Sequence, residues 1–246
     1  MSDSPQLAAV IMAAGIGKRM EDDRPKVLHE YAGRPMIAAV VETALAVGAD
    51  PVIVVVGHKA DEVKAAVAGQ HVEFAHQAEQ QGTAHAVLQA APLLEQFTGD
   101  VVVLSGDVPA LTTGTLKGLI RRHRETGAAA TVLAAELPDA SGYGRVILDD
   151  HQLLLKVVEE KDATPEERLV KLINSGIYLF KAQHLLSSLL MVGNQNKQSE
   201  YYLPDTLYIL KEQNLPVAVE KITGFREILG VNTKAELEKL NEELTD

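Results

Sequence analysis

The chain has 246 residues, a formal net charge of −11 and no cysteine. Its length suits one large domain or two small ones. The lack of cysteine excludes disulfides, thiolate nucleophiles and cysteine-ligated metals. The acidic charge argues against nucleic-acid binding, which favours a basic face. The first residues, MSDSPQ, do not form a signal peptide, and no apolar run reaches the length of a membrane span. We therefore expect a cytoplasmic protein that binds small molecules and has no nucleic-acid or membrane partner.

Apolar runs alternate with helical patterns in the first half of the sequence. Residues 8–13 form a buried-strand run that leads into a glycine-rich loop at 14–17. The elements expected next are a helix at 36–47, a strand at 52–56, a helix at 60–68, a strand at 72–75, a helix at 83–91 before Pro92, a strand at 101–104 and a helix at 112–126. Strands that are apolar on both faces and alternate with helices indicate a covered parallel sheet. The fold class expected is therefore α/β, with an open, doubly wound, mostly parallel sheet.

The second half of the sequence does not continue the regular alternation of strands and helices. Its patterns predict strands at 128–136, 145–148, 153–159 and 171–180, helices at 182–190 and 201–213, a last strand at 226–231 and a charged helix from Thr233. Turns separate the strands, and no linker or repeat divides the two halves. We expect a single domain, 1–246, in which this half continues the sheet and adds a small inserted antiparallel lobe.

The loop after the first strand carries the clearest chemical signal. A glycine-rich loop at the carboxyl end of a strand lets backbone N–H groups approach a polyanion. Arg19 and Lys26 add positive charge suited to phosphates. Met12 stands where a Walker A loop needs glycine, and Met20 stands where the dinucleotide motif needs its third glycine. Local composition alone is equally consistent with an ordinary strand–helix turn that carries surface cations.

Two oxygen-bearing side chains are candidates for a magnesium site. Asp107 follows the buried strand at 101–104, and Asn232 follows the predicted strand at 226–231. Mg²⁺ prefers oxygen ligands and retains waters and substrate phosphates. Taken singly, Asp107 is more simply a turn residue before Pro109, and Asn232 is more simply the N-cap of the last helix.

Other polar residues follow predicted strands at the same rim, where ligands bind in open α/β sheets. Glu159 and Asn174 suit sugar hydroxyls, and the turn at 142–144 exposes backbone N–H groups. Gln77 and the 82–83 pair could read the edge of a base. Each of these signals is weak on its own.

The sequence does not indicate a histidine-ligated metal or a catalytic histidine. The eight histidines lack metal-binding spacings, and no Ser-His-Asp set or G-x-S-x-G motif occurs. His58, His76 and His85 are interpreted as surface or helix-packing residues. The cationic run at 121–124 is interpreted as the solvated face of a helix.

The motifs together resemble a known family. MAAGIGKRM followed by PKVLHEYAGRPM is similar to the signature loop of sugar-nucleotide pyrophosphorylases. The segments QAEQQGTAHAV, SGDVP, SGYGRV, VVEEKDAT, INSGIY, SEYYLPD and GVN follow in the family's order. They most resemble the uridyltransferase domain of bacterial bifunctional N-acetylglucosamine-1-phosphate uridyltransferases, and the similarity runs from about Ala8 to Leu244.

This resemblance implies a Rossmann-like nucleotidyltransferase fold and Mg²⁺-dependent transfer of a uridylyl group from UTP to N-acetylglucosamine 1-phosphate. Residues 1–127 would form the nucleotide-binding half, residues 128–232 the sugar-binding half and residues 233–246 a C-terminal helix. Arg19 and Lys26 would act on the phosphates being exchanged, and Asp107 and Asn232 would hold Mg²⁺. The remaining contacts implied for the nucleotide and its surroundings are Met12, Ala13, Ala14, Gly15, Gln77, Gly82, Thr83, Ser105 and Gly106, and those implied for the sugar are Gly144, Glu159 and Asn174.

Two departures from the family pattern keep alternatives open. Pro204 stands where the family more often has threonine, which affects the expected sugar specificity. The family's bifunctional members continue into a hexapeptide-repeat β-helix, whereas this sequence ends at Asp246 without such repeats, so we expect it to lack their acetyltransferase activity. Another sugar 1-phosphate or nucleotide, such as glucose 1-phosphate with UTP or dTTP, is the nearest alternative. A non-catalytic nucleotide-sugar-binding subunit is the alternative of another class. The oligomeric state stays open.

Overall fold

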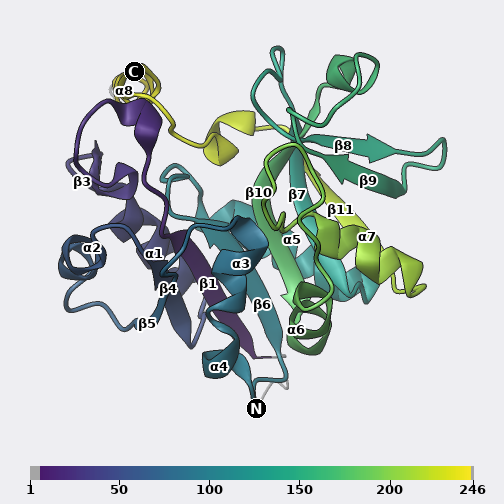
Figure 1. The fold of residues 1–246 in the computed structure, drawn as a ribbon, viewed down its shortest axis with the longest axis horizontal. Coiled ribbons are helices and arrows are strands. Elements are labelled where there is room, and N and C mark those ends of the chain that lie inside the picture. The colour runs from purple at the N-terminus through teal and green to yellow at the C-terminus, as the bar shows by residue number, and fades with distance from the viewer. Residues whose placement is uncertain (1–5, 245–246) are drawn as a thin grey trace.

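A computed structural model describes residues 6–244, and its centre is a nine-stranded mixed sheet (Figure 1). Seven strands form its main path in the order β11-β7-β10-β6-β1-β4-β5, and β8 and β9 extend it from β10. The strands are β1 (Leu7–Ala13), β4 (Val52–Val56), β5 (Glu73–His76), β6 (Asp100–Ser105), β7 (Ala130–Glu136), β8 (Arg145–Leu148), β9 (Leu154–Val158), β10 (Leu172–Lys181) and β11 (Val217–Ile222). A separate two-stranded ribbon pairs β2 (Glu30–Tyr31) with β3 (Arg34–Pro35).

The helices cover both faces of this sheet. They are α1 (Met36–Ala46), α2 (Ala60–Ala66), α3 (Thr83–Leu88), α4 (Ala91–Leu94), α5 (Thr113–Thr126), α6 (Ala182–Leu189), α7 (Asp205–Glu212) and α8 (Lys234–Glu242). Short 3₁₀ turns occur as η1 (Lys18–Met20), η2 (Lys26–Leu28), η3 (Glu167–Leu169) and η4 (Phe225–Ile228). The expected α/β architecture with a mostly parallel sheet is confirmed.

Strand β1 shows why the sheet is covered on both sides. Its side chains alternate between two hydrophobic clusters: Ile11 packs with α1, α2 and α5, whereas Val10 packs with α3, α4, α6 and α7. Both side chains are fully buried. A strand that is apolar at every position is therefore the pattern that two covered faces require.

The parallel pairs of the sheet direct several strand ends to one edge. β1 pairs in parallel with β4 and β6, and Met12 of β1 lies opposite Ser105 of β6. β10 is antiparallel to both β6 and β7. As a result the loops that follow β1 and β6 emerge side by side, at the edge where open α/β sheets bind ligands.

The inserted antiparallel lobe expected from the sequence is present. β8 and β9 form an antiparallel pair that joins β10 through the pairing of Arg145 with Ile173. Figure 1 shows this lobe and α8 on opposite sides of the same end of the molecule, beyond the ends of the central strands. Both parts therefore flank the ligand-binding edge of the sheet.

A third, smaller hydrophobic cluster attaches the C-terminal helix to this edge. Met20, which follows the glycine loop, packs with Met36 at the start of α1 and with Val231, Leu237 and Leu240 near and on α8. Thr233 caps α8 by accepting a hydrogen bond from the Glu236 backbone N–H. The cluster thus fixes the distant C-terminal segment beside the loop that follows β1.

Three predictions about elements and burial were wrong. The strand expected at 226–231 is the 3₁₀ turn η4 followed by irregular chain, and the last strand is β11, which pairs in parallel with β7. The helix expected at 83–91 ends at Leu88, and Pro92 lies in the first turn of α4, where its missing N–H costs nothing. His123, assigned to a solvated face, is buried and contacts Thr131.

No helix in the described part of the chain has the length and apolarity needed to cross a membrane.

Asp100 is a buried carboxylate that joins β6 to α5. It accepts a hydrogen bond from Arg124 Nε at 3.0 Å and lies 3.6 Å from His123 Nε2. Burial raises the pKa of Asp100, but the contacts with His123 and Arg124 outweigh it and lower the pKa below its ordinary value. The charged form therefore stabilises this junction.

We predict that Asp100→Ala lowers the free energy of unfolding by about 1–3 kcal/mol, because His123 and Arg124 lose a buried partner. Urea unfolding followed by circular dichroism measures this change. Asp61→Ala, at an exposed position on α2, is the matched control and should change stability by less than about 0.5 kcal/mol. Equal stability of the two variants would contradict the role given to Asp100.

Candidate active site

An ion pair joins the loop after β1 to the end of β6. Lys26 in η2 contacts Asp107 through its ammonium group, and both side chains are largely buried. Ser105 donates a hydrogen bond of 2.6 Å to the other oxygen of Asp107. The close approach of η2 depends on Gly17, whose φ is +70° and where an added Cβ would lie 2.6 Å from Lys26 Cβ.

Asn232 brings the C-terminal segment to the same point. Its Oδ1 accepts hydrogen bonds from Arg19 at 2.7 Å and from Lys26 Nζ at 3.2 Å. The N-cap role that the sequence left open for Asn232 belongs to Thr233. Glu236 holds Asn232 from behind by accepting a 2.7 Å hydrogen bond from its backbone N–H. The amide oxygen of Asn232 is consequently turned toward the two cations.

The charge state of Asp107 follows from these contacts. Burial alone would raise its pKa, but the neighbouring Lys26 ammonium and the hydrogen bond from Ser105 lower it below the ordinary value. Asp107 is therefore a carboxylate at neutral pH.

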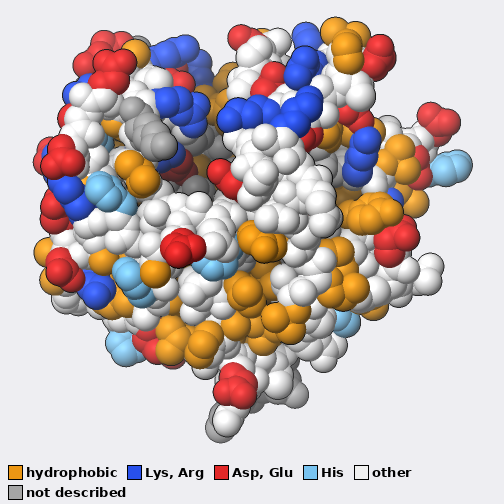
Figure 2. Space-filling model, viewed as in Figure 1, with side chains coloured by type: hydrophobic (Ala, Val, Ile, Leu, Met, Phe, Trp, Pro, Cys, Tyr) orange, Lys and Arg blue, Asp and Glu red, His pale blue; other side chains and the backbone are white. Residues whose placement is uncertain are grey.

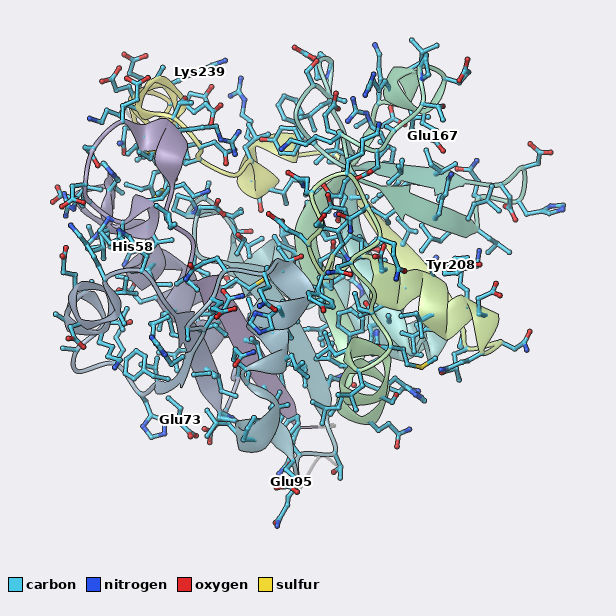
Figure 3. All side chains as sticks on the ribbon, in the orientation of Figure 1. His58, Glu73, Glu95, Glu167, Tyr208 and Lys239 are labelled. Atoms are coloured by element: carbon cyan, nitrogen blue, oxygen red, sulfur yellow. The ribbon has the colours of Figure 1, made fainter. Side chains whose placement is uncertain are left out.

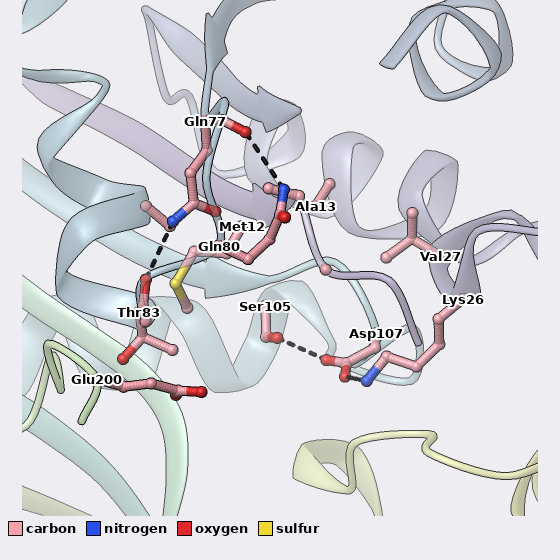
Figure 4. Close-up of a pocket in the computed structure, with 14 residues that line it drawn as sticks. Met12, Ala13, Lys26, Val27, Gln77, Gln80, Thr83, Ser105, Asp107 and Glu200 are labelled. Carbon is pink, nitrogen blue, oxygen red and sulfur yellow. Dashed lines mark hydrogen bonds and ion pairs between the residues drawn. The ribbon is translucent and has the colours of Figure 1, made fainter. Parts of the chain in front are cut away.

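A cavity of about 240 Å³ extends from this ion pair along the ends of β1 and β6 (Figure 4). Its lining contains many residues that the sequence predicted: Met12, Ala13, Ala14, Gly15, Lys26, Gln77, Gly82, Thr83, Ser105 and Asp107. Sequence reasoning missed four others, namely Val27, Gln80, Ala86 and Glu200. Gly106 lies behind the lining, where its N–H donates to the Met12 carbonyl at 2.9 Å.

The far end of this cavity is built from β5 and the start of α3. Gln77 directly follows β5 and is buried, and its Nε2 donates to the Gly82 carbonyl at 3.2 Å. Gly82 has φ +114°, and a Cβ there would lie 2.5 Å from the Tyr201 carbonyl oxygen, so only glycine fits. Thr83, the first residue of α3, does not cap the helix, and its hydroxyl accepts a hydrogen bond from the Leu203 N–H at 2.9 Å.

The three residues predicted for the sugar lie together on the antiparallel lobe and β10. The Asn174 N–H donates to the Gly144 carbonyl at 2.8 Å. A Cβ on Gly144 would lie 3.5 Å from Glu159 Oε1. The pairing of β10 with β7 shifts register between Asn174 and Tyr178, and the Asn174 amide bonds the buried Tyr178 hydroxyl. The irregular strand thus brings Asn174 next to the turn and the carboxylate.

Glu159 differs electrostatically from Asp107. Burial, followed by the nearby carboxylates of Asp205, Asp162 and Glu200, raises the pKa of Glu159 to about 7. Glu200 also lines the cavity beyond β1 and β6, so the residues around Glu159 and those of this cavity are neighbours. The surroundings of Glu159 are therefore rich in carboxylates, whereas Arg19 and Lys26 gather at Asn232.

The surface views agree with this arrangement. Figure 2 shows the molecule hollowed between its two upper parts, with Lys and Arg side chains gathered around the opening. In Figure 3, Lys239 on α8 and Glu167 beside the antiparallel lobe mark the two flanking parts, and Glu73 and Glu95 lie at the remote end of the molecule. The candidate site therefore occupies the cleft between α8 and the lobe.

The residues of the site fit a divalent cation such as Mg²⁺. Asp107 and Asn232 present a carboxylate and an amide oxygen to the same ammonium nitrogen, so a cation is already accommodated between them. These hard oxygen donors are the type that Mg²⁺ prefers. Within residues 6–244 no group of three or more His, Cys, Asp or Glu side chains could hold a metal ion.

Comparison with known proteins adds an independent line of evidence. The protein named "Bifunctional protein GlmU" of Pelotomaculum thermopropionicum is 47% identical over 238 residues, which are 97% of this chain and 52% of the relative. The proteins of the same name from Geobacter metallireducens and Exiguobacterium sibiricum are each 46% identical, over 94% and 93% of this chain and 49% and 51% of the relatives. The chain thus spans about half the length of the curated relatives it matches.

A family match covers most of the residues that line the cavity. Residues 9–168 match the family described as "MobA-like NTP transferase domain". This range includes the glycine loop, Lys26, Gln77, Asp107 and Glu159. The chain therefore belongs to the family of MobA-like NTP transferase domains.

Proposed function

We propose that this chain transfers a uridylyl group from UTP to N-acetylglucosamine 1-phosphate and releases pyrophosphate and UDP-N-acetylglucosamine, in the cytoplasm. The observation that carries the proposal is the Lys26–Asp107–Asn232–Arg19 cluster at the mouth of the cavity beyond β1 and β6. Membership of a nucleotidyltransferase family and the motif resemblance from Ala8 to Leu244 support the same reaction.

This chemistry needs positioning and charge neutralisation more than proton transfer. The phosphate of a sugar 1-phosphate is already anionic, so its oxygen can attack the α-phosphorus of UTP in line without a general base. Arg19 and Lys26 would stabilise the negative charge that builds on the phosphates. Backbone N–H groups of residues 13–15 would hold the triphosphate where it leaves β1.

Asp107 and Asn232 are the residues that would hold a divalent ion, for which we propose Mg²⁺. When bound, this ion would supply charge neutralisation for the phosphate oxygens. Lys26 contacts both residues, so its ammonium also neutralises Asp107. It would remain close enough to bind a phosphate oxygen.

The sugar would lie against Gly144, Glu159 and Asn174, and the base against Gln77, Gly82 and Thr83. We propose accordingly that residues 1–127 bind the nucleotide and residues 128–232 the sugar within one domain. Strands from both parts belong to one sheet, which supports their assignment to one domain.

A panel of triphosphates and sugar 1-phosphates, assayed for pyrophosphate release with and without Mg²⁺, tests the proposal. UTP with N-acetylglucosamine 1-phosphate should give the highest kcat/KM. A higher value with glucose 1-phosphate or dTTP would replace this substrate assignment. Binding of UDP-N-acetylglucosamine without turnover of any pair would instead indicate a non-catalytic subunit.

We predict that Arg19→Ala lowers kcat by about 10²-fold or more, a size typical of losing one contact to charge in the transition state. Pyrophosphate release under saturating substrates measures this change. Arg121→Ala, on the exposed face of α5, is the matched control for loss of an arginine. Near-normal turnover in a folded Arg19→Ala protein would remove Arg19 from the mechanism.

We predict that Asp107→Ala abolishes metal-dependent activity and weakens metal binding in the absence of substrate. The reason is that an alanine leaves Asn232 as the single oxygen donor of the proposed pair. Mn²⁺ binding followed by electron paramagnetic resonance provides a readout independent of turnover. Asp150→Ala, in the exposed turn between β8 and β9, is the control. Unchanged Mn²⁺ affinity in Asp107→Ala would count against the assignment.

We predict that Glu159→Gln stabilises the protein at pH 8 by about 1–3 kcal/mol and has little effect at pH 5. The pKa of Glu159 is about 7 in the folded protein and lower in the unfolded chain. The folded state therefore binds the proton more tightly, and its stability falls as the pH rises from about 4.5 to about 7. Urea unfolding at both pH values measures the difference. An equal effect at pH 5 and pH 8 would show that the carboxylate is not buried as described.

A further inference from the structure

The amide of Gln77 has a fixed orientation. Its side-chain nitrogen lies 3.2 Å from the Gly82 carbonyl oxygen and 3.0 Å from His85 Nδ1. A carbonyl oxygen can only accept a hydrogen bond, so the amide atom that faces it must be the nitrogen. The orientation therefore follows from the acceptor character of the Gly82 carbonyl.

The same contacts define the state of His85. Because Gln77 Nε2 donates, His85 Nδ1 must accept, and the ring proton then resides on Nε2. Both N–H groups of the Gln77 amide are thereby engaged by protein acceptors. Its oxygen, Oε1, is the amide atom left to accept a hydrogen bond from a ligand.

The position of His85 is fixed by the packing of α3. The Ala84 N–H donates to the Tyr201 carbonyl at 2.9 Å, which anchors the first turn of the helix. The His85 ring lies 6.4 Å from the Tyr201 ring, and Gln89 donates to the His85 carbonyl at 2.9 Å. A ring held in this way can fix its partner, because a hydrogen bond positions a group only when the acceptor is itself immobile.

Gln77 stands at the end of the cavity remote from the cations. Figure 4 shows Lys26 and Asp107 at one end of the lining and Gln77 at the other. A nucleotide whose phosphates lie at Lys26 would direct its base toward Gln77. This step rests on the function proposed above.

We propose that His85 is a positioning residue: as the second acceptor beside the Gly82 carbonyl, it holds the Gln77 amide with Oε1 free for a ligand and thereby helps to select the base. With Oε1 as an acceptor, Gln77 matches a base whose ring nitrogen carries a proton, as N3 of uracil does. The N3 of cytosine carries no proton and is itself an acceptor. It would require the opposite face of the amide, which Gly82 and His85 together disfavour.

The test compares three variants of His85. His85→Phe and His85→Leu remove the acceptor while differing in size. His85→Asn retains an acceptor, since an asparagine oxygen can stand near the position of Nδ1. The measured quantities are the ratio of kcat/KM for UTP over CTP and the ratio of their binding constants by calorimetry. His151→Leu, at the exposed turn between β8 and β9, is the control.

We expect the preference for UTP over CTP to fall about tenfold in His85→Phe and His85→Leu, the factor that about 1.4 kcal/mol represents. His85→Asn and His151→Leu should keep the ratio within about threefold of wild type. Thermal unfolding of each variant identifies those that are folded, and the two acceptor-free variants provide independent chances of a folded protein. A purely structural role would weaken both nucleotides equally and leave the ratio unchanged.

An unchanged ratio in a folded acceptor-free variant would overturn the proposal. An equal loss in His85→Asn would also overturn it, because that variant keeps the acceptor. A wild-type protein that binds UTP more tightly than CTP without turning over any sugar phosphate would contradict the proposed reaction alone. The binding ratios of the variants would still decide the role of His85.

Discussion

The ion pair between Lys26 and Asp107 is the contact around which the site is organised. It joins residues 81 positions apart, and Asn232, a further 206 positions from Lys26, closes it with its amide oxygen. Charges removed from water need partners, so this pair can form only when the loop after β1, the end of β6 and the C-terminal segment are all in place. The parallel pairing of β1 with β6 supplies the first two, and the packing of Met20 with α8 supplies the third. A defect in any of these elements would leave a buried charge without its partner.

Much of the fold followed from local pattern. The run at 52–56 is apolar at every position and forms β4, because both of its faces are covered. β11 was missed because its side chains are only partly buried at the edge of the sheet, where a strand needs no continuous apolar run. The segment at 226–231 has an apolar composition because Ile228 and Val231 are buried in two hydrophobic clusters, but it pairs with no strand among the described residues. Burial, not pairing, explains its composition.

Some residues of the site could likewise be predicted from local sequence pattern, and others could not. Asp107 could be predicted as a site residue because strand ends gather at one edge of a parallel sheet. That Gly144, Glu159 and Asn174 lie together could be expected only from the resemblance to the family. Their proximity depends on a register shift in β10 that no local sequence pattern predicts. Glu200 enters the cavity through a loop whose position is set by hydrogen bonds to residues 81–84. His85, interpreted as a surface or packing residue, acquires a chemical role only through its distance from Gln77.

The contrast between the cationic and the acidic surroundings affects how a sugar 1-phosphate would bind under the proposed function. Arg19 and Lys26 gather at Asn232, whereas burial and the carboxylates around Glu159 raise its pKa to about 7. A dianionic phosphate placed near Glu159 would be repelled, whereas an uncharged sugar there meets groups that can exchange hydrogen bonds with its hydroxyls. The reversed orientation is therefore penalised by like charges as well as by the loss of cationic contacts. The carboxylates around Glu159 would in this way orient the acceptor, so that its phosphate oxygen faces the α-phosphorus held at the glycine loop.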